Sequence, residues 1–81
     1  MYFTYVLQSL KDRRYYYGSA SNLEERLKAH NAGKVRSTKS RRPLKIIYYE
    51  TFDSRSEAYR RELFFKSKEG YEWLKKEGII R

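Results

Sequence analysis

The chain has 81 residues, no cysteine, one histidine and a formal net charge of +9. It can form no disulfide and no thiolate metal site, and one histidine cannot build a multi-histidine zinc site, so any metal must be held mainly by oxygen. Its longest apolar run falls far short of the roughly 20 residues of a membrane span, and its start lacks the layout of a secretory signal. We expect one domain over residues 1–81, in a soluble, cytoplasmic protein.

The positive charge is concentrated in the middle of the chain. No carboxylate occurs between Glu25 and Glu50, whereas eight basic residues fall there: Arg26, Lys28, Lys34, Arg36, Lys39, Arg41, Arg42 and Lys45. Such a field attracts polyanions, nucleic acids among them. The plainer alternative is a solvated run of charge on a soluble protein.

The first part of the chain predicts a β-hairpin. Residues 2–9 are rich in aromatic and β-branched types that alternate along the chain, which is typical of a strand. The polar residues 11–13 indicate a turn, and residues 14–19 predict a second strand with high β propensity that stops at Gly18. Two strands joined by so short a turn must be antiparallel.

A helix and a third strand are expected next. Ser21 and Glu24 form a capping box, and Gly33 lies where a helix C-terminal cap would be, so we place a helix at about 22–32. Residues 34–43 combine charge, serine, threonine and one proline, which predicts a loop or one short helical turn. Residues 44–52 predict the third strand.

The last third of the chain is expected to be helical. A second capping box, Ser54 with Glu57, begins a helix that we expect to run to about Lys68. Gly70 is expected to separate it from a shorter helix. The order ββαβαα predicts a small α/β layer structure.

Glu62 is a charged residue on what should be the inner face of this helix. At 100° per residue it falls near the middle of an apolar arc formed by Ala58, Tyr59, Leu63 and Phe65. A buried carboxylate needs a positive partner, because burying it alone costs several kcal/mol. Lys66, four residues later, could be that partner, and such a pair is a common helix stabiliser.

The first helix carries basic groups in a similar position. His30 shares one stripe with Leu23 and Leu27, and Arg26 lies at its edge. The ordinary interpretations are a core histidine with a hydrogen-bond partner and an arginine whose stem packs on the leucines. Yet this helix must cover a hairpin bearing Tyr5 and Tyr16, so tyrosine, arginine, histidine and glutamate could converge on one pocket.

Taken together, these residues resemble the motif set of the GIY-YIG nucleases. The resemblance rests on Phe3-Thr4-Tyr5, Tyr16-Tyr17-Gly18-Ser19, Arg26, His30 and Glu62, and it spans nearly the whole chain. Residues 41–62 are also similar to small single-domain bacterial endonucleases of this family, and the set is similar to the catalytic domain of the excinuclease C subunit. Phe3, Thr4 and Tyr17 depart from the family pattern, and a late asparagine of larger members has no counterpart here.

The resemblance implies an α+β fold, a three-stranded antiparallel sheet flanked by helices, and a metal-dependent DNA endonuclease that serves DNA repair or processing. It implies that Glu62 binds a single Mg²⁺ or Mn²⁺ ion. Tyr5 would act as general base or orient the attacking water. Arg26 and the metal would lower the Tyr5 pKa, and Arg26 would also bind the phosphate. Tyr16 and His30 would hydrogen-bond the water, the phosphate or Tyr5, and Gly18 would allow a close backbone approach.

DNA is therefore the expected partner, with RNA left open as a second one. We expect six basic residues to grip phosphates with little sequence specificity: Lys34, Arg36, Lys39, Arg41, Arg42 and Lys45. One alternative is a nucleic-acid-binding module with the same fold and no chemistry. Another is a structural domain in which Glu62 pairs with Lys66 or Arg26.

Overall fold

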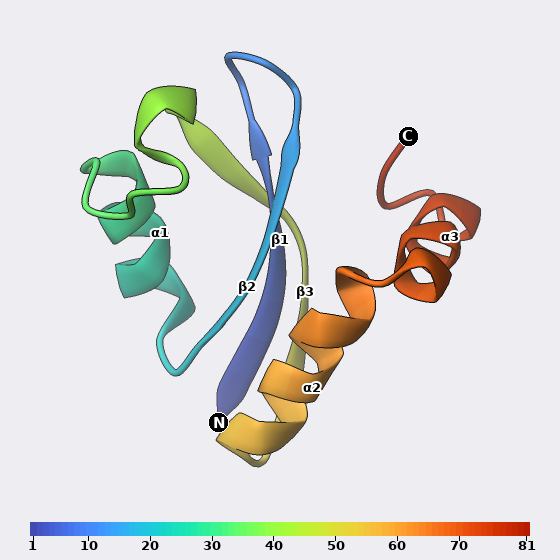
Figure 1. The fold of residues 1–81 in the computed structure, drawn as a ribbon. Coiled ribbons are helices and arrows are strands. Elements are labelled where there is room, and N and C mark those ends of the chain that lie inside the picture. The colour runs from blue at the N-terminus through green and yellow to red at the C-terminus, as the bar shows by residue number, and fades with distance from the viewer.

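A three-stranded antiparallel sheet forms the centre of the computed structural model, which describes all 81 residues. The strands are β1 (Tyr2–Ser9), β2 (Tyr15–Ala20) and β3 (Leu44–Phe52), in the order β2-β1-β3. Helix α1 (Leu23–Asn31) covers one face of the sheet, and α2 (Arg55–Phe65) and α3 (Lys68–Lys76) lie on the other (Figure 1). A 3-10 turn, η1 (Lys39–Arg41), precedes β3. The predicted α+β fold and its ββαβαα order are confirmed.

Both faces of the central strand are buried, because helices cover the sheet on each side. Tyr5 and Leu7 of β1 point toward α1 and pack with Leu44, Leu23 and Leu27. Val6, on the opposite face, forms a second core that includes three residues of the C-terminal third: Phe65, Leu74 and Ile80. Because side chains alternate along β1, Tyr5 lies in the core beneath α1, whereas its neighbours Thr4 and Val6 face the side of the sheet covered by α2 and α3.

The boundaries of β2 and α1 differ from those predicted. Strand β2 begins at Tyr15, because Arg13 adopts a positive φ of 66° and the Asp12 side chain accepts a hydrogen bond from the Arg14 amide, which extends the turn. Helix α1 is capped by Asn22, which accepts from the Glu25 amide, so the predicted Ser21 capping box is wrong. Asparagine is as good a cap as serine, and the chain offers both in succession.

The break between the last two helices is also not where it was expected. Helix α2 ends at Phe65, and Ser67 caps α3, so Gly70 lies within the first turn of α3 instead of separating the helices. A Cβ at Gly70 would lie 1.7 Å from the carbonyl oxygen of Phe64. Glycine here permits the start of α3 to pack against the end of α2. None of the helices is long and apolar enough to span a lipid bilayer.

The inner face of α2 is only partly the predicted one. Ala58 and Phe65 are buried as expected, but Tyr59 and Leu63 are about half exposed, so their predicted inward orientation is wrong. The sheet twists across the helix, and α2 turns its Ala58 and Glu62 side toward β1 and β2. Glu62 thus lies against the sheet, at the edge of the core.

Candidate active site

Tyr5 stands at the centre of a cluster of polar side chains on the α1 face of the sheet. Its hydroxyl lies 3.0 Å from Nε2 of His30 and accepts a longer hydrogen bond, 3.4 Å, from Nε of Arg26. The ring of Tyr16 packs edge-on against His30, with centroids 4.9 Å apart. Helix α1 contributes both basic side chains because residues 26 and 30 are one turn apart and share a face. The structure therefore brings together Tyr5, Tyr16, Arg26 and His30.

Gly18 is the residue that makes room for the Tyr5 hydroxyl. The two residues are paired across β1 and β2, and a Cβ at position 18 would lie 2.4 Å from the Tyr5 oxygen. A Cβ atom essentially never lies within 3.0 Å of such a neighbour, so any larger residue at this position would displace the phenol. The close approach expected at Gly18 is thus made by a side chain of the site itself.

His30 is held from its other side by Thr38, a residue that the sequence analysis did not single out. Nδ1 of His30 and the Thr38 hydroxyl oxygen are 2.7 Å apart, and that hydroxyl donates to the carbonyl oxygen of Val35. The threonine oxygen must then accept from Nδ1–H, which leaves the Nε2 lone pair directed at Tyr5. Thr38 and His30 are both fully buried. The only sequence signal for Thr38 is its place in a segment rich in serine and threonine.

Burial decides the protonation of this cluster. It lowers the pKa of His30 to about 4, with help from the positive charge of Arg26, so the imidazole is neutral at pH 7. Burial also raises the pKa of Tyr5 above its usual 10, and this effect outweighs the lowering by the Arg26 guanidinium. Arg26 thus lowers the Tyr5 pKa as expected, but by less than burial raises it, so Tyr5 is a neutral phenol that donates to His30.

Glu62 approaches the cluster from the other side of the sheet edge. One carboxylate oxygen accepts a hydrogen bond from Ser19 of β2 at 2.8 Å, and the other accepts from Nζ of Lys66 at 2.7 Å. The Glu62 side chain is 12% exposed, whereas Lys66 is 48% exposed. The pairing with Lys66 that the helix spacing suggested is thus present, and Arg26 is not part of it.

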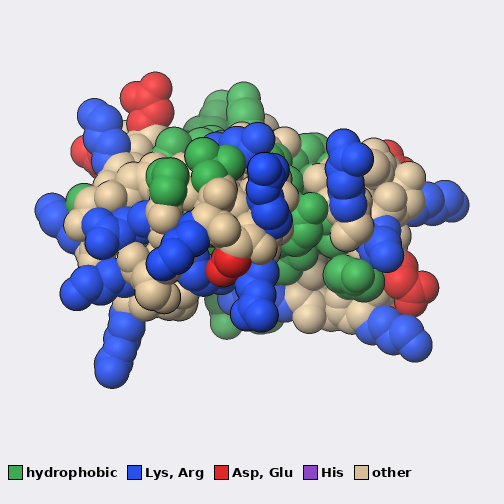
Figure 2. Space-filling model, turned by 90° about the horizontal axis from the view of Figure 1, so that it is seen from above, with side chains coloured by type: hydrophobic (Ala, Val, Ile, Leu, Met, Phe, Trp, Pro, Cys, Tyr) green, Lys and Arg blue, Asp and Glu red, His purple; other side chains and the backbone are tan.

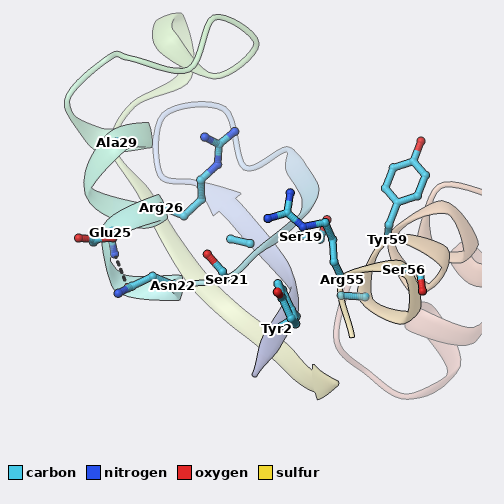
Figure 3. A pocket seen from close by; sticks show the side chains of 12 residues that line it. Tyr2, Ser19, Ser21, Asn22, Glu25, Arg26, Ala29, Arg55, Ser56 and Tyr59 are labelled. Carbon is cyan, nitrogen blue, oxygen red and sulfur yellow. Dashed lines mark hydrogen bonds between the residues drawn. The ribbon is translucent and has the colours of Figure 1, made fainter. Parts of the chain in front are cut away.

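An open groove adjoins these groups. It has a volume of about 860 Å³ and lies between the N-terminal ends of α1 and α2 (Figure 3). Arg26 and Ser19 line it, so it reaches the hydrogen-bond partners of both Tyr5 and Glu62. The phenol itself is only 1% exposed. A ligand in the groove would meet Arg26 before it met Tyr5.

The basic segment, residues 34–45, lies at the end of α1 that is far from this groove. Both η1 and the segment that leads into β3 pack beside the C-terminal end of α1. Helix α2 begins at the opposite end of the molecule (Figure 1). Lys and Arg side chains are spread widely over the surface at the end where the β1–β2 turn lies (Figure 2). Five of the six predicted phosphate-binding residues are exposed: Lys34, Arg36, Lys39, Arg42 and Lys45.

Arg41 differs from the rest of the basic segment. Its guanidinium donates to the carbonyl oxygen of Tyr15 and pairs with Asp12 at 3.4 Å, and its side chain is only 20% exposed. Arg41 thus fastens η1 to the hairpin. Its positive charge is already partly neutralised within the chain.

Known proteins are similar to this chain in both sequence and fold. The model of the GIY-YIG catalytic domain matches residues 1–76. The UPF0213 protein SH2523 of Staphylococcus haemolyticus is 43% identical over 67 residues, which are 82% of this chain and 80% of the relative. The UPF0213 protein CPE1444 of Clostridium perfringens is 42% identical over 67 residues, 82% of this chain and 71% of the relative.

A solved structure agrees with these matches. The solution NMR structure of the UPF0213 protein BH0048 from Bacillus halodurans is 32% identical, with a TM-score of 0.52, and the match covers 91% of this chain and 82% of that one. The family model, the relatives and the fold point the same way: the chain belongs to the GIY-YIG catalytic domain family, a superfamily of nucleases.

Proposed function

We propose that this chain is a metal-dependent endonuclease that hydrolyses phosphodiester bonds in DNA, and that it serves DNA repair or processing. One observation carries the proposal: the Tyr5 hydroxyl touches both a neutral histidine and an arginine that lines an open groove. The Tyr5 hydroxyl thus has a proton acceptor, His30, and a cationic hydrogen-bond donor, Arg26, beside it. This arrangement suits proton transfer beside a bound phosphate.

The proton path runs from water through Tyr5 to His30. The attacking water would give its proton to the Tyr5 oxygen as the phenol passes its own proton to Nε2 of His30, and because Tyr5 is only 1% exposed, substrate binding at Arg26 must first open the phenol to the groove. A free phenolate is rare because the Tyr5 pKa is raised and the His30 pKa is about 4, so the two transfers must accompany attack on phosphorus. Negative charge gathering on the phosphate near Arg26 would offset the repulsion between Arg26 and a protonated His30.

Arg26 is the group that would bind the scissile phosphate. Its Nε is engaged by Tyr5, which fixes the guanidinium plane, and this hydrogen bond raises the pKa of Arg26 so that it stays charged. Arginine–phosphate hydrogen bonds are short and strong, and they tighten as charge grows in the transition state. Arg26 thus both binds the substrate and stabilises the reaction. Tyr16 keeps His30 in place by packing against its ring.

GIY-YIG nucleases typically use a divalent metal, and Glu62 is the proposed ligand in this chain; no group of three or more metal-ligating side chains occurs here, so water and phosphate oxygens would complete the ligand set. Glu62 would hold Mg²⁺ or Mn²⁺, because one carboxylate with water and phosphate oxygens is a usual ligand set for magnesium. A cationic group, the Lys66 ammonium, already lies against this carboxylate, and Lys66 is exposed enough to swing away. When bound, the metal polarises the phosphate and stabilises the leaving oxygen.

The basic segment would hold the flanking phosphates. Five exposed lysines and arginines supply cations for phosphate contacts, which carry no sequence information, so binding should have little sequence specificity: Lys34, Arg36, Lys39, Arg42 and Lys45. Arg41 would contribute less, since Asp12 already pairs with it. DNA is the proposed substrate, and RNA is the comparison substrate in any assay.

The experiment is incubation of the purified protein with plasmid and branched DNA in Mg²⁺, Mn²⁺ or EDTA. We expect cutting with either metal and none with EDTA. Glu62→Gln and Arg26→Ala should each slow cutting by about a hundredfold, whereas Glu72→Gln, which neutralises an exposed acid of α3, should leave the rate unchanged. Cutting in EDTA, or equal rates for Glu62→Gln and Glu72→Gln, would contradict the proposal.

A non-catalytic nucleic-acid-binding module is the second candidate. The ion pair between Glu62 and Lys66 favours it, because a carboxylate held in this way is stable without any metal. Binding of DNA by the folded wild-type chain, with no cutting in either metal, would support this candidate. A purely structural domain would bind no DNA at all.

A further inference from the structure

Arg55 lies on the side of the groove opposite Arg26. It is the first residue of α2, it is exposed, and its guanidinium carbon lies 5.8 Å from the centre of the Tyr2 ring. Arg55 extends from the start of α2 toward Arg26 of α1, above Tyr2 and Ser21 (Figure 3). The cation–π contact orients the side chain over the groove without neutralising it.

Neither of the two arginines is in an ion pair. The ion pairs of the chain join other residues, namely Arg41 with Asp12, Arg61 with Glu50, and Lys66 with Glu62. Glu25 is the one acid that lines the groove, and its carboxylate points away from both arginines (Figure 3). Two cations that face each other across a hollow repel one another unless an anion lies between them.

The rest of the lining suits the remainder of a nucleotide. Small and hydroxylated residues line the groove, namely Ser19, Ala20, Ser21, Ala29 and Ala58, and half-exposed Tyr59 lines it on the α2 side. Hydroxyls can bond sugar oxygens, and an exposed aromatic ring can stack on a base. The volume of about 860 Å³ lies in the range of sites for small organic ligands.

We propose that this groove binds the nucleotide next to the scissile phosphate, with Arg55 on the neighbouring phosphate and Arg26 on the scissile one. The inference rests on the proposed function and extends it to the side of the site that the basic segment cannot reach. That segment lies at the other end of α1, so a strand held at both ends would cross the catalytic cluster. The occupant is the sugar–phosphate of a polynucleotide.

The test is binding of a fluorescent DNA oligonucleotide in EDTA, where nothing is cut, over a range of salt concentrations. Arg55→Gln should weaken binding about tenfold and reduce the slope of log K against log salt by about one, as expected for a lost phosphate contact. Arg60→Gln is the matched control, because Arg60 is an exposed arginine of the same helix that does not line the groove. It should leave the slope unchanged.

Ala29→Leu tests the nucleotide part of the groove without changing charge. A leucine is well tolerated on a helix, and here it would fill space between α1 and α2, so binding should weaken while the salt slope stays the same. Circular dichroism confirms that each variant is folded. Equal slopes for Arg55→Gln and Arg60→Gln, or wild-type affinity in Ala29→Leu, would overturn the proposal.

The outcomes separate this inference from the proposed function. A wild-type chain that never cuts, together with a reduced slope in Arg55→Gln, would leave the nucleotide groove standing and remove the hydrolase. A chain that cuts with Mg²⁺, together with an unchanged slope in Arg55→Gln, would leave the hydrolase and remove the groove.

Discussion

Thr38 touches the proposed reaction only through His30. Its buried hydroxyl accepts from Nδ1 and so fixes which ring nitrogen faces Tyr5. Thr38→Val keeps the shape and removes the acceptor, so it should destabilise the fold by about 1–3 kcal/mol and slow DNA cutting about tenfold. Urea unfolding and single-turnover cutting measure the two effects.

Thr38→Ser is the control, because serine keeps the hydroxyl and loses only a methyl group. It should recover most of the cutting rate, and the nitrogen chemical shifts of His30 should report the wild-type tautomer in Thr38→Ser and a changed one in Thr38→Val. A valine variant with the wild-type rate and tautomer would show that Thr38 only fills space.

The buried imidazole of His30 should also make stability depend on pH. The pKa of His30 falls from about 6.5 in the unfolded chain to about 4 in the folded one, so the unfolded state takes up protons first. The stabilisation is complete above pH 6.5 and is lost as pH falls through 4, by about 3 kcal/mol in all. Urea unfolding at pH 7.5, 5 and 4 measures this loss.

His30→Gln is the reference for that measurement, because it cannot titrate. The difference in unfolding free energy between the wild type and His30→Gln should shrink as pH is lowered from 7 to 4. A difference that stays constant over this range would mean that His30 is not held neutral by burial.

Residue types and spacing predict most of the residues of the candidate site, but they do not predict its hydrogen bonds or the pKa values of its groups. Tyr5, Arg26 and His30 meet because one strand and one helix face each other, and alternation along the chain is enough to predict that. Thr38 could not be predicted, since Ser37 and Ser40 are equally good hydrogen-bond partners in the sequence. The Tyr5 pKa could not be predicted either, because it depends on how completely the ring is buried.

At the scale of elements, the corner between α2 and α3 depends on one glycine. A methyl group at Gly70 would collide with the Phe64 carbonyl, so Gly70→Ala should cost about 3 kcal/mol of unfolding free energy. Gly78→Ala is the comparison: its φ of 77° disfavours alanine, but no atom lies within 4 Å, and about 1 kcal/mol should be lost. Equal costs would mean that the close packing at Gly70 does not matter.

The strands were easier to predict than the helix ends. The bounds of β1 and β3 agree with the prediction because long runs of aromatic and β-branched residues define them. The capping residue of α1 and the break after α2 were wrong, since several capping residues compete there and tertiary packing selects one. Tyr59 and Leu63 are exposed because the sheet covers only one side of α2, which helical periodicity alone cannot locate.

At the scale of the whole molecule, the charge is spread along the path that a DNA strand would take. Lys39 and Arg42 lie at one end of α1, and Arg55 lies at the start of α2 at the other. Replacing Lys39 and Arg42 together by glutamine should reduce the slope of log K against log salt by about two. The same change at Lys75 and Lys76 of α3 should leave the slope as it is.

Equal losses from the two double variants would mean that DNA responds to net charge alone. Anisotropy titrations between 50 and 200 mM salt measure both, and a wild-type chain with about six phosphate contacts should lose roughly a thousandfold in affinity over this range. Binding whose affinity does not change with salt concentration would contradict the proposed phosphate contacts.

The most direct test of the proposed chemistry is the single-turnover rate of DNA cutting in Mg²⁺ for Tyr5→Phe beside Tyr49→Phe. Tyr5→Phe removes the one oxygen that joins His30 to Arg26, whereas Tyr49 is half exposed on β3 and outside the cluster. We predict a fall of at least about a hundredfold for Tyr5→Phe in a folded protein and the wild-type rate for Tyr49→Phe. A folded Tyr5→Phe protein that cuts DNA at the wild-type rate would contradict the account.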